Sequence, residues 1–168
     1  MTEEVKIEVI QPFSNLIYKI PMPENVTQGL IEHTDKMRED PNTPSFGESL
    51  VGQVDEELEI DISKLQPIIP VSQKDGEYNP IHTHPAAAVS GVLYLKIPEY
   101  KKDKKDTTRP HKQRTDDGSL VFTNNSGADR RYCVSNCNFN PKVGELFIFG
   151  GMQPHQVYPF RSVDGEGE

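Results

Sequence analysis

Residues 79–97 have the sequence N-P-I-H-T-H-P-A-A-A-V-S-G-V-L-Y-L-K-I, and this stretch decides which fold the chain can adopt. Its second half is an apolar run closed by turn residues, which predicts a strand over residues 89–97. Its first half predicts a strand over residues 78–84 that carries His82 and His84. Because the side chains of residues i and i+2 in a strand point to the same face, the two imidazoles can reach one metal ion.

Short β-type segments continue on both sides of this stretch. Two of them lie within residues 5–21, and four more are predicted at residues 119–123, 131–135, 145–149 and 155–160. Gly, Pro, Asn and Asp lie between these segments, as expected for turns. Many short strands at this spacing favour a β-sandwich or a barrel over a helical bundle.

Two segments depart from this β pattern. Residues 24–39 have apolar side chains at helical spacing and precede Pro41, which predicts an N-terminal helix flanking the barrel. Residues 101–114 contain seven basic residues and almost nothing apolar, so residues 99–117 are expected to form a long loop between two strands. That loop is either a solvated insertion or a cover over the metal side of the barrel.

The whole chain is short and acidic. Its 168 residues suit one domain over residues 1–168, and its formal net charge of −8 argues against nucleic-acid partners, which bind a basic face. No apolar run approaches the roughly 18 residues that cross a membrane, and the acidic start from Met1 to Glu4 does not resemble a secretory signal. Cys133 and Cys137, the only two cysteines, are expected to be reduced thiols, which predicts a cytoplasmic protein.

A third histidine completes a candidate metal site. His155 lies in P-H-Q-V-Y-P (residues 154–159), which follows a predicted strand and a glycine turn at Gly150. In a small barrel, strands that are far apart in the sequence face the same axis. We therefore predict that His82, His84 and His155 hold one metal ion.

Four pieces of the chain between Glu77 and Arg161 carry a family resemblance. They are E-Y-N-P-I-H-T-H-P, S-G-V-L-Y-L-K-I-P, D-G-S-L-V-F and V-G-E-L-F-I-F-G-G-M-Q-P-H-Q-V-Y-P-F. With these pieces the chain resembles the 2-oxoglutarate/Fe(II) oxygenases of bacteriophages and marine bacteria, which are distant relatives of prolyl 4-hydroxylases.

The resemblance implies a mostly β fold, the double-stranded β-helix or jelly roll of the cupin type, with Fe(II) at one mouth. It implies 2-oxoglutarate as the cosubstrate and O₂ as the oxidant in the hydroxylation of a C–H bond. The substrate it suggests is a prolyl or other peptide side chain, or a small molecule. The setting it implies is the cytoplasm of a bacterium or of a phage-infected host cell.

The iron ligands implied by the resemblance depart from the wider superfamily at one position. That superfamily uses His-x-Asp/Glu and a distal His, so His82 and His155 take the two histidine positions and His84 replaces the carboxylate. Three imidazoles would leave the charge of the metal uncompensated. His84 is therefore either a third ligand or a neighbour of a two-histidine site, and the metal is either iron or another ion.

The second carboxylate of the cosubstrate is expected to meet a phenol and a guanidinium. Tyr94 matches a tyrosine that contacts this carboxylate in prolyl hydroxylase relatives, and Arg161 is the candidate for a bidentate cation. In relatives that cation lies further beyond the distal histidine. We therefore expect that a chain ending at residue 168 lacks the final C-terminal strand of the family.

Two other functions remain open at this point. A cupin-like metalloenzyme with three histidine ligands would need no keto acid, and the presence of His84 favours it. A non-catalytic jelly-roll binding protein would hold no metal, and the lack of a clear cosubstrate arginine favours it.

Overall fold

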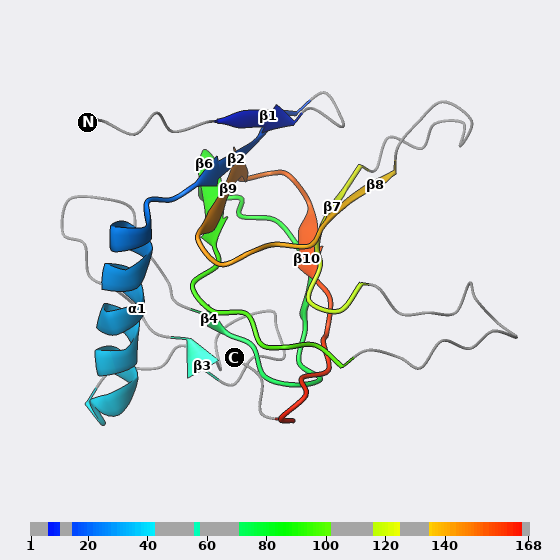
Figure 1. Cartoon of the computed structure of the whole chain (residues 1–168). Coiled ribbons are helices and arrows are strands. Elements are labelled where there is room, and N and C mark those ends of the chain that lie inside the picture. Colours follow the sequence, from blue (N-terminus) through cyan, green and yellow to red (C-terminus); the bar gives the residue numbers. More distant parts are fainter. Residues whose placement is uncertain are drawn as a thin grey trace, which may run out of the picture.

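The computed structural model is mostly β, with one helix among the residues it describes (Figure 1). The described residues are 7–10, 15–42, 56–57, 71–101, 116–124 and 135–165. Two four-stranded antiparallel sheets dominate this part of the chain, and a small third sheet pairs β3 (Glu56–Glu57) with β4 (Val71–Ser72). No helix in the described ranges is long and apolar enough to span a membrane.

The first sheet joins segments from both ends of the sequence. Its order is β1 (Glu8–Ile10), β2 (Ile17–Pro21), β9 (Glu145–Gly150) and β6 (Val89–Leu93). The apolar strand β9 lies between β2 and β6, so that Phe149 is opposite both Ile17 and Ser90. Strand β6 comes from the predicted V-S-G-V-L run, although it ends at Leu93 and not at residue 97.

The second sheet brings two histidine-bearing segments together. Its order is β5 (Asn79–His82), β10 (His155–Val157), β7 (Leu120–Thr123) and β8 (Asn136–Phe139). In this sheet His155 lies opposite His82 on one side and opposite Phe122 on the other. The antiparallel register therefore places two distant histidines next to each other.

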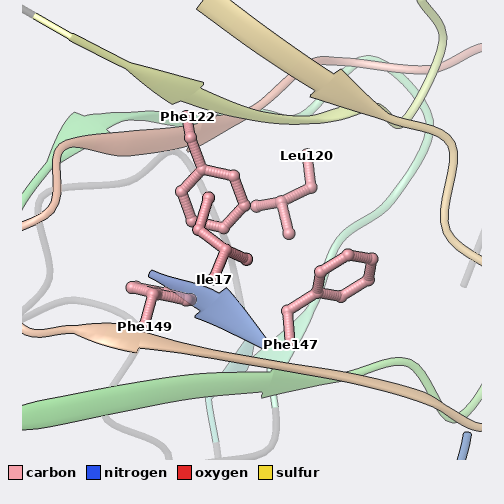
Figure 2. Close-up of a cluster of buried hydrophobic side chains, with 5 residues drawn as sticks. All are labelled: Ile17, Leu120, Phe122, Phe147 and Phe149. Carbon is pink, nitrogen blue, oxygen red and sulfur yellow. The ribbon is translucent and has the colours of Figure 1, made fainter. Parts of the chain in front are cut away.

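The hydrophobic core lies between the two sheets (Figure 2). Its five buried side chains come from β2, β7 and β9: Ile17, Leu120, Phe122, Phe147 and Phe149. The rings of Phe122 and Phe149 pack edge to face, with their centroids 4.9 Å apart. Burying each such side chain contributes on the order of 1.5–3 kcal/mol, so these residues hold the sheets against each other.

Helix α1 (Glu24–Glu39) has the bounds predicted from the sequence. Its two buried positions are Thr27 and Thr34, whose hydroxyls donate to backbone carbonyls of the preceding turn. The ammonium of Lys96 lies 2.7 Å from the carboxylate of Asp35, which ties the helix to the segment after β6.

Like β6, two further predicted strands are shorter than expected. The strand predicted at residues 155–160 stops at Val157, since Pro159 has no N–H to donate to a ladder. The strand predicted at residues 78–84 stops at His82, and the chain then enters a turn.

Two predictions fall mainly outside the described residues. These are residues 102–115 of the loop predicted at 99–117 and residues 131–134 of the strand predicted at 131–135. The strand observed in the second region, β8, begins at residue 136.

The described residues at the start of the predicted loop contact the segment that follows β10. Tyr100 forms an isolated bridge with Ser162, and the N–H of Lys101 donates to the carbonyl of Arg161 over 2.7 Å. Both partners lie beyond the end of β10, whereas His155 is its first residue. Residues 102–115 of the loop lie outside the described residues, so its expected position over the metal side of the barrel stays a prediction.

Candidate metal centre

Three histidines converge at one end of the second sheet. His82 is the last residue of β5, and His155 is the first residue of β10 directly opposite. His84 is not in a strand, and its backbone N–H instead donates to the carbonyl of Gly151 over 2.7 Å. The sequence argument placed His82 and His84 on one strand face, whereas it is a turn that brings His84 to the other two.

The distances among the three rings suit a shared ion. The centroid of His82 lies 5.0 Å from that of His84 and 4.3 Å from that of His155, and the third separation is 5.1 Å. One ring nitrogen from each residue lies within 4.8 Å of the others. Two nitrogens that bind neighbouring positions of one ion lie roughly 3 Å apart, so small rotations of the side chains would complete the site.

Backbone carbonyls fix the orientation of two of the rings. The carbonyl of Pro80 lies 2.7 Å from Nδ1 of His82, and the carbonyl of Gln153 lies 2.9 Å from Nδ1 of His155. A carbonyl can only accept a hydrogen bond, so in each neutral ring the proton is placed on Nδ1. The Nε2 lone pairs of His82 and His155 are left to bind a metal, as in known sites where a second hydrogen bond orients the ligand.

Burial favours the neutral form of two candidate ligands, His84 and His155. His155 is only 2% exposed, and the ring of Phe149 packs against it with centroids 4.6 Å apart. Burial lowers the pKa of His155 to about 4; the hydrogen bond to Gln153 acts in the opposite direction, and the nearby His82 and His84 lower it further. Burial, followed by the charge of His82, also lowers the pKa of His84. A neutral imidazole is the form that binds metals.

Gly151 allows the two turns of the site to approach each other closely. A Cβ at this position would collide with the carbonyl oxygen of Ala87 and would lie 2.7 Å from that of His84. The sequence showed a glycine turn before His155 but gave no indication of what it contacts. Gln153, whose role is argued below, was also missed, because a lone glutamine in a turn carries no pattern.

Tyr94 is partly buried against the hydrophobic core, directly after β6. Its ring packs edge-on against Phe147 with centroids 6.3 Å apart, and its hydroxyl is buried without a hydrogen-bond partner among the described residues. Burial, with a smaller contribution from Tyr100, raises the pKa of Tyr94. The phenol is therefore a neutral donor facing a place where no acceptor is described.

Arg161 is not brought to the histidines. It lies beyond β10, and its Nη2 donates to Oδ2 of Asp117 over 2.9 Å. Asp117 is almost fully buried, so the ion pair is shielded from water on one side. Any other carboxylate that approached this guanidinium would have to share it with Asp117.

The set of donors limits the chemistry of the site. Imidazoles suit iron, zinc and copper, whereas the hard ions magnesium and calcium prefer oxygen ligands. Three protein nitrogens would hold such an ion and would leave part of its coordination sphere open to other ligands. The three histidines therefore fit a transition metal better than magnesium or calcium.

The family comparison agrees with this geometry. Residues 69–165 match the family model described as "Putative 2OG-Fe(II) oxygenase". The matched stretch contains all five residues singled out from the sequence: His82, His84, Tyr94, His155 and Arg161. No curated protein matches the chain.

Proposed function

The chain belongs to the 2OG-Fe(II) oxygenase family, and on this premise we propose that it is an Fe(II)/2-oxoglutarate-dependent dioxygenase that hydroxylates a C–H bond. The observation that carries the proposal is the convergence of three histidine nitrogens within 4.8 Å of one another. When bound, the iron and the keto acid supply the activation of O₂, with decarboxylation of 2-oxoglutarate to succinate.

The protein contributes a prepared set of donors. His82, His84 and His155 would hold the iron, and the carbonyls of Pro80 and Gln153 keep two of the rings in the ligating tautomer. Phe149 covers one side of His155 and excludes water from it. Because none of the three ligands carries a negative charge, an anionic chelator would compensate the charge of the metal, which favours a keto acid as the cosubstrate.

We propose that the interior between the sheets receives the far end of the cosubstrate. The buried hydroxyl of Tyr94 lacks a partner among the described residues and would donate to the second carboxylate. Arg161 is the candidate cation for the same carboxylate, and Asp117 would have to share its guanidinium. Of the two residues, Tyr94 has the stronger support, since no acceptor among the described residues competes for its hydroxyl.

The finer architecture is part of the same proposal. The two sheets would be the halves of a double-stranded β-helix, and residues 1–168 would form one domain. Ile17 from β2 shares the core with Leu120 from β7 and Phe147 from β9, which supports a single unit. The leading substrate class is a prolyl or other peptide side chain, on the resemblance to prolyl 4-hydroxylases, and the proposed compartment is the cytoplasm.

The test is turnover of the cosubstrate by the purified protein. The protein is loaded with Fe(II) without oxygen, mixed with 2-oxoglutarate and exposed to O₂, and succinate is measured against a control without iron and a His155→Ala variant. We expect slow succinate formation even when no substrate to be hydroxylated is added. It should require the protein, Fe(II), 2-oxoglutarate and O₂ together. Iron binding without any succinate would favour a three-histidine metalloenzyme that needs no keto acid. A failure to bind iron would favour a non-catalytic binding protein.

A further inference from the structure

Gln153 is a buried amide in the turn between β9 and β10. It is only 2% exposed, and its side chain makes three hydrogen bonds. Nε2 donates to the carbonyls of Thr123 (2.9 Å) and Pro154 (3.0 Å), and Oε1 accepts from Nδ2 of Asn15 (3.1 Å). One side chain thus links the end of β7, the residue before His155 and the turn that precedes β2.

The backbone of the same residue touches the candidate metal ligand. The carbonyl of Gln153 accepts the hydrogen bond from Nδ1 of His155 (2.9 Å), and its N–H donates to the carbonyl of Gly150 (2.9 Å). Only a few covalent bonds therefore separate the side-chain amide of Gln153 from the carbonyl that contacts His155. A movement of the Gln153 side chain would be transmitted directly to the carbonyl that faces the ring.

His82 and His155 differ in how the carbonyl facing each ring is fixed. The carbonyl that faces His82 belongs to Pro80, which lies within β5 between the paired residues Asn79 and His82, where the register with β10 shifts. The carbonyl that faces His155 belongs to a turn, where no ladder fixes the backbone. At this position the hydrogen bonds of the Gln153 side-chain amide fix the backbone, in place of the hydrogen bonds between strands.

We propose that Gln153 is a positioning residue for His155: its side chain locks the turn so that the Gln153 carbonyl holds the proton on Nδ1 and leaves Nε2 to the metal. The inference rests on the proposed function in one respect, namely that His155 binds a metal. If the carbonyl turned away, the Nδ1 proton could move to Nε2 and remove the lone pair that binds. Loss of such a supporting contact typically weakens metal affinity by roughly 10- to 100-fold.

The chain offers a matched control for the loss of the amide. Gln73 also donates Nε2 to two backbone carbonyls, those of Glu77 (2.7 Å) and Tyr158 (3.1 Å), but it contacts the chain beyond β10, away from His155. Gln153→Met and Gln73→Met therefore remove the same kind of hydrogen bonds and keep the side-chain length. A variant Gln153→Glu retains the acceptor toward Asn15 and loses both donors.

The experiment measures Co(II) binding and the visible absorption spectrum of the Co(II) protein. We expect Gln153→Met and Gln153→Glu to weaken Co(II) binding roughly 10- to 100-fold and to shift the ligand-field bands, while Gln73→Met leaves both unchanged. If Gln153→Met does not fold, Gln153→Glu decides the matter by the same two readouts.

Wild-type affinity and an unchanged spectrum in the folded Gln153 variants would overturn the proposal. An equal loss of affinity in Gln73→Met would also overturn it, because the effect would then be one of general stability. If the wild-type protein binds no Co(II), the metal site and this inference both fail. If it binds Co(II) but makes no succinate, only the dioxygenase assignment fails, and the Gln153 variants still decide the inference.

Discussion

At the scale of single residues, the burial of His155 both prepares a metal ligand and makes the metal-free protein sensitive to acid. The ring is almost fully buried against Phe149 and Phe122, where a charged imidazolium is unfavourable. A bound metal ion would add a favourable interaction to this ring, beside the hydrogen bond between its Nδ1 and the Gln153 carbonyl. The stability of the metal-free protein should therefore depend on pH through His155.

The first prediction concerns the stability of the metal-free protein. The pKa of His155 is about 4 in the folded state and about 6.5 when unfolded, so between these values the unfolded state binds more protons. The contribution of His155 is therefore fully present above pH 6.5 and is lost as the pH falls towards 4, by roughly 3 kcal/mol at most. Urea unfolding of the chelator-treated protein at pH 7 and pH 5 measures this loss.

His155→Gln serves as the comparison for that measurement, because it removes the titrating ring. The loss of stability between pH 7 and pH 5 should be smaller in the variant than in the wild-type protein. An equal loss in both proteins would show that His155 is not the group responsible.

The second prediction separates stability from cosubstrate binding at Tyr94. The Tyr94 hydroxyl is buried without a partner in the part of the chain that the structure describes, which costs roughly 1–3 kcal/mol, so Tyr94→Phe should stabilise the protein without cosubstrate. The same change should weaken 2-oxoglutarate binding by about tenfold or more, since a hydrogen bond to a carboxylate is lost. Thermal unfolding and titration with 2-oxoglutarate measure the two effects, and Tyr18→Phe on the exposed face of β2 is the control. Unchanged affinity for the cosubstrate would rule out the assigned role of Tyr94.

The sequence predicted the residues with distinctive chemistry and missed those that act through the backbone. His82, His84 and His155 were predicted to converge, because the H-x-H pair and the later P-H motif both lie on β-type segments. The structure brings the three side chains together. Gln153 and Gly151 were not predicted. Their effect depends on which carbonyls they meet, and those contacts are long-range.

At the scale of elements, two turns build the centre. The turn after β5 carries His84, and the turn after β9 leads to His155. Two hydrogen bonds join them: His84 N–H to the Gly151 carbonyl (2.7 Å) and Gly151 N–H to the Ala88 carbonyl (3.2 Å). Their close approach is possible only because Gly151 has no side chain.

The third prediction concerns this approach. In Gly151→Ala the new methyl group would meet the carbonyl oxygens of Ala87 and His84, which are backbone atoms and cannot rotate away. We expect a loss of stability of about 1–3 kcal/mol from overpacking and a clear weakening of metal binding, because the turn that carries His84 must shift. Chemical unfolding and Co(II) titration measure these effects.

The adjacent glycine provides the control. Gly150 has open space around its Cβ position, and its φ lies outside the left-handed region, so Gly150→Ala should leave stability and metal binding close to wild type. Equal behaviour of the two variants would remove the special role assigned to Gly151.

Local sequence patterns predicted the elements better than their ends. The helix over residues 24–39 follows from its spacing and the prolines around it, and α1 has these bounds. The strand expected over residues 78–84 ended early, since the turn that carries His84 is stabilised by Gly151, far away in the sequence. Apolar periodicity contains no information about such a partner.

At the scale of the whole molecule, the site depends on pairings between distant segments. β10, which begins with His155, pairs with β5, which ends with His82, and also with β7, so the histidine-bearing strands are held by partners that are distant in the sequence. The sequence indicated many short strands and a barrel or sandwich, but not which strands are neighbours. Strand order is set by the burial of residues such as Ile17 and Phe149 across the two sheets, which no single segment reveals.

The central claim is that the three histidines form an iron site that binds 2-oxoglutarate, and a spectroscopic titration tests it most directly. 2-Oxoglutarate is added without oxygen to the Fe(II) protein, and the visible charge-transfer band of an Fe(II)–keto acid chelate is recorded for the wild type and for His82→Ala, His84→Ala and His155→Ala. The account predicts a saturable band in the wild type that is lost or greatly weakened in each variant. A wild type that binds Fe(II) without developing the band, or a band of wild-type intensity in all three variants, would contradict it.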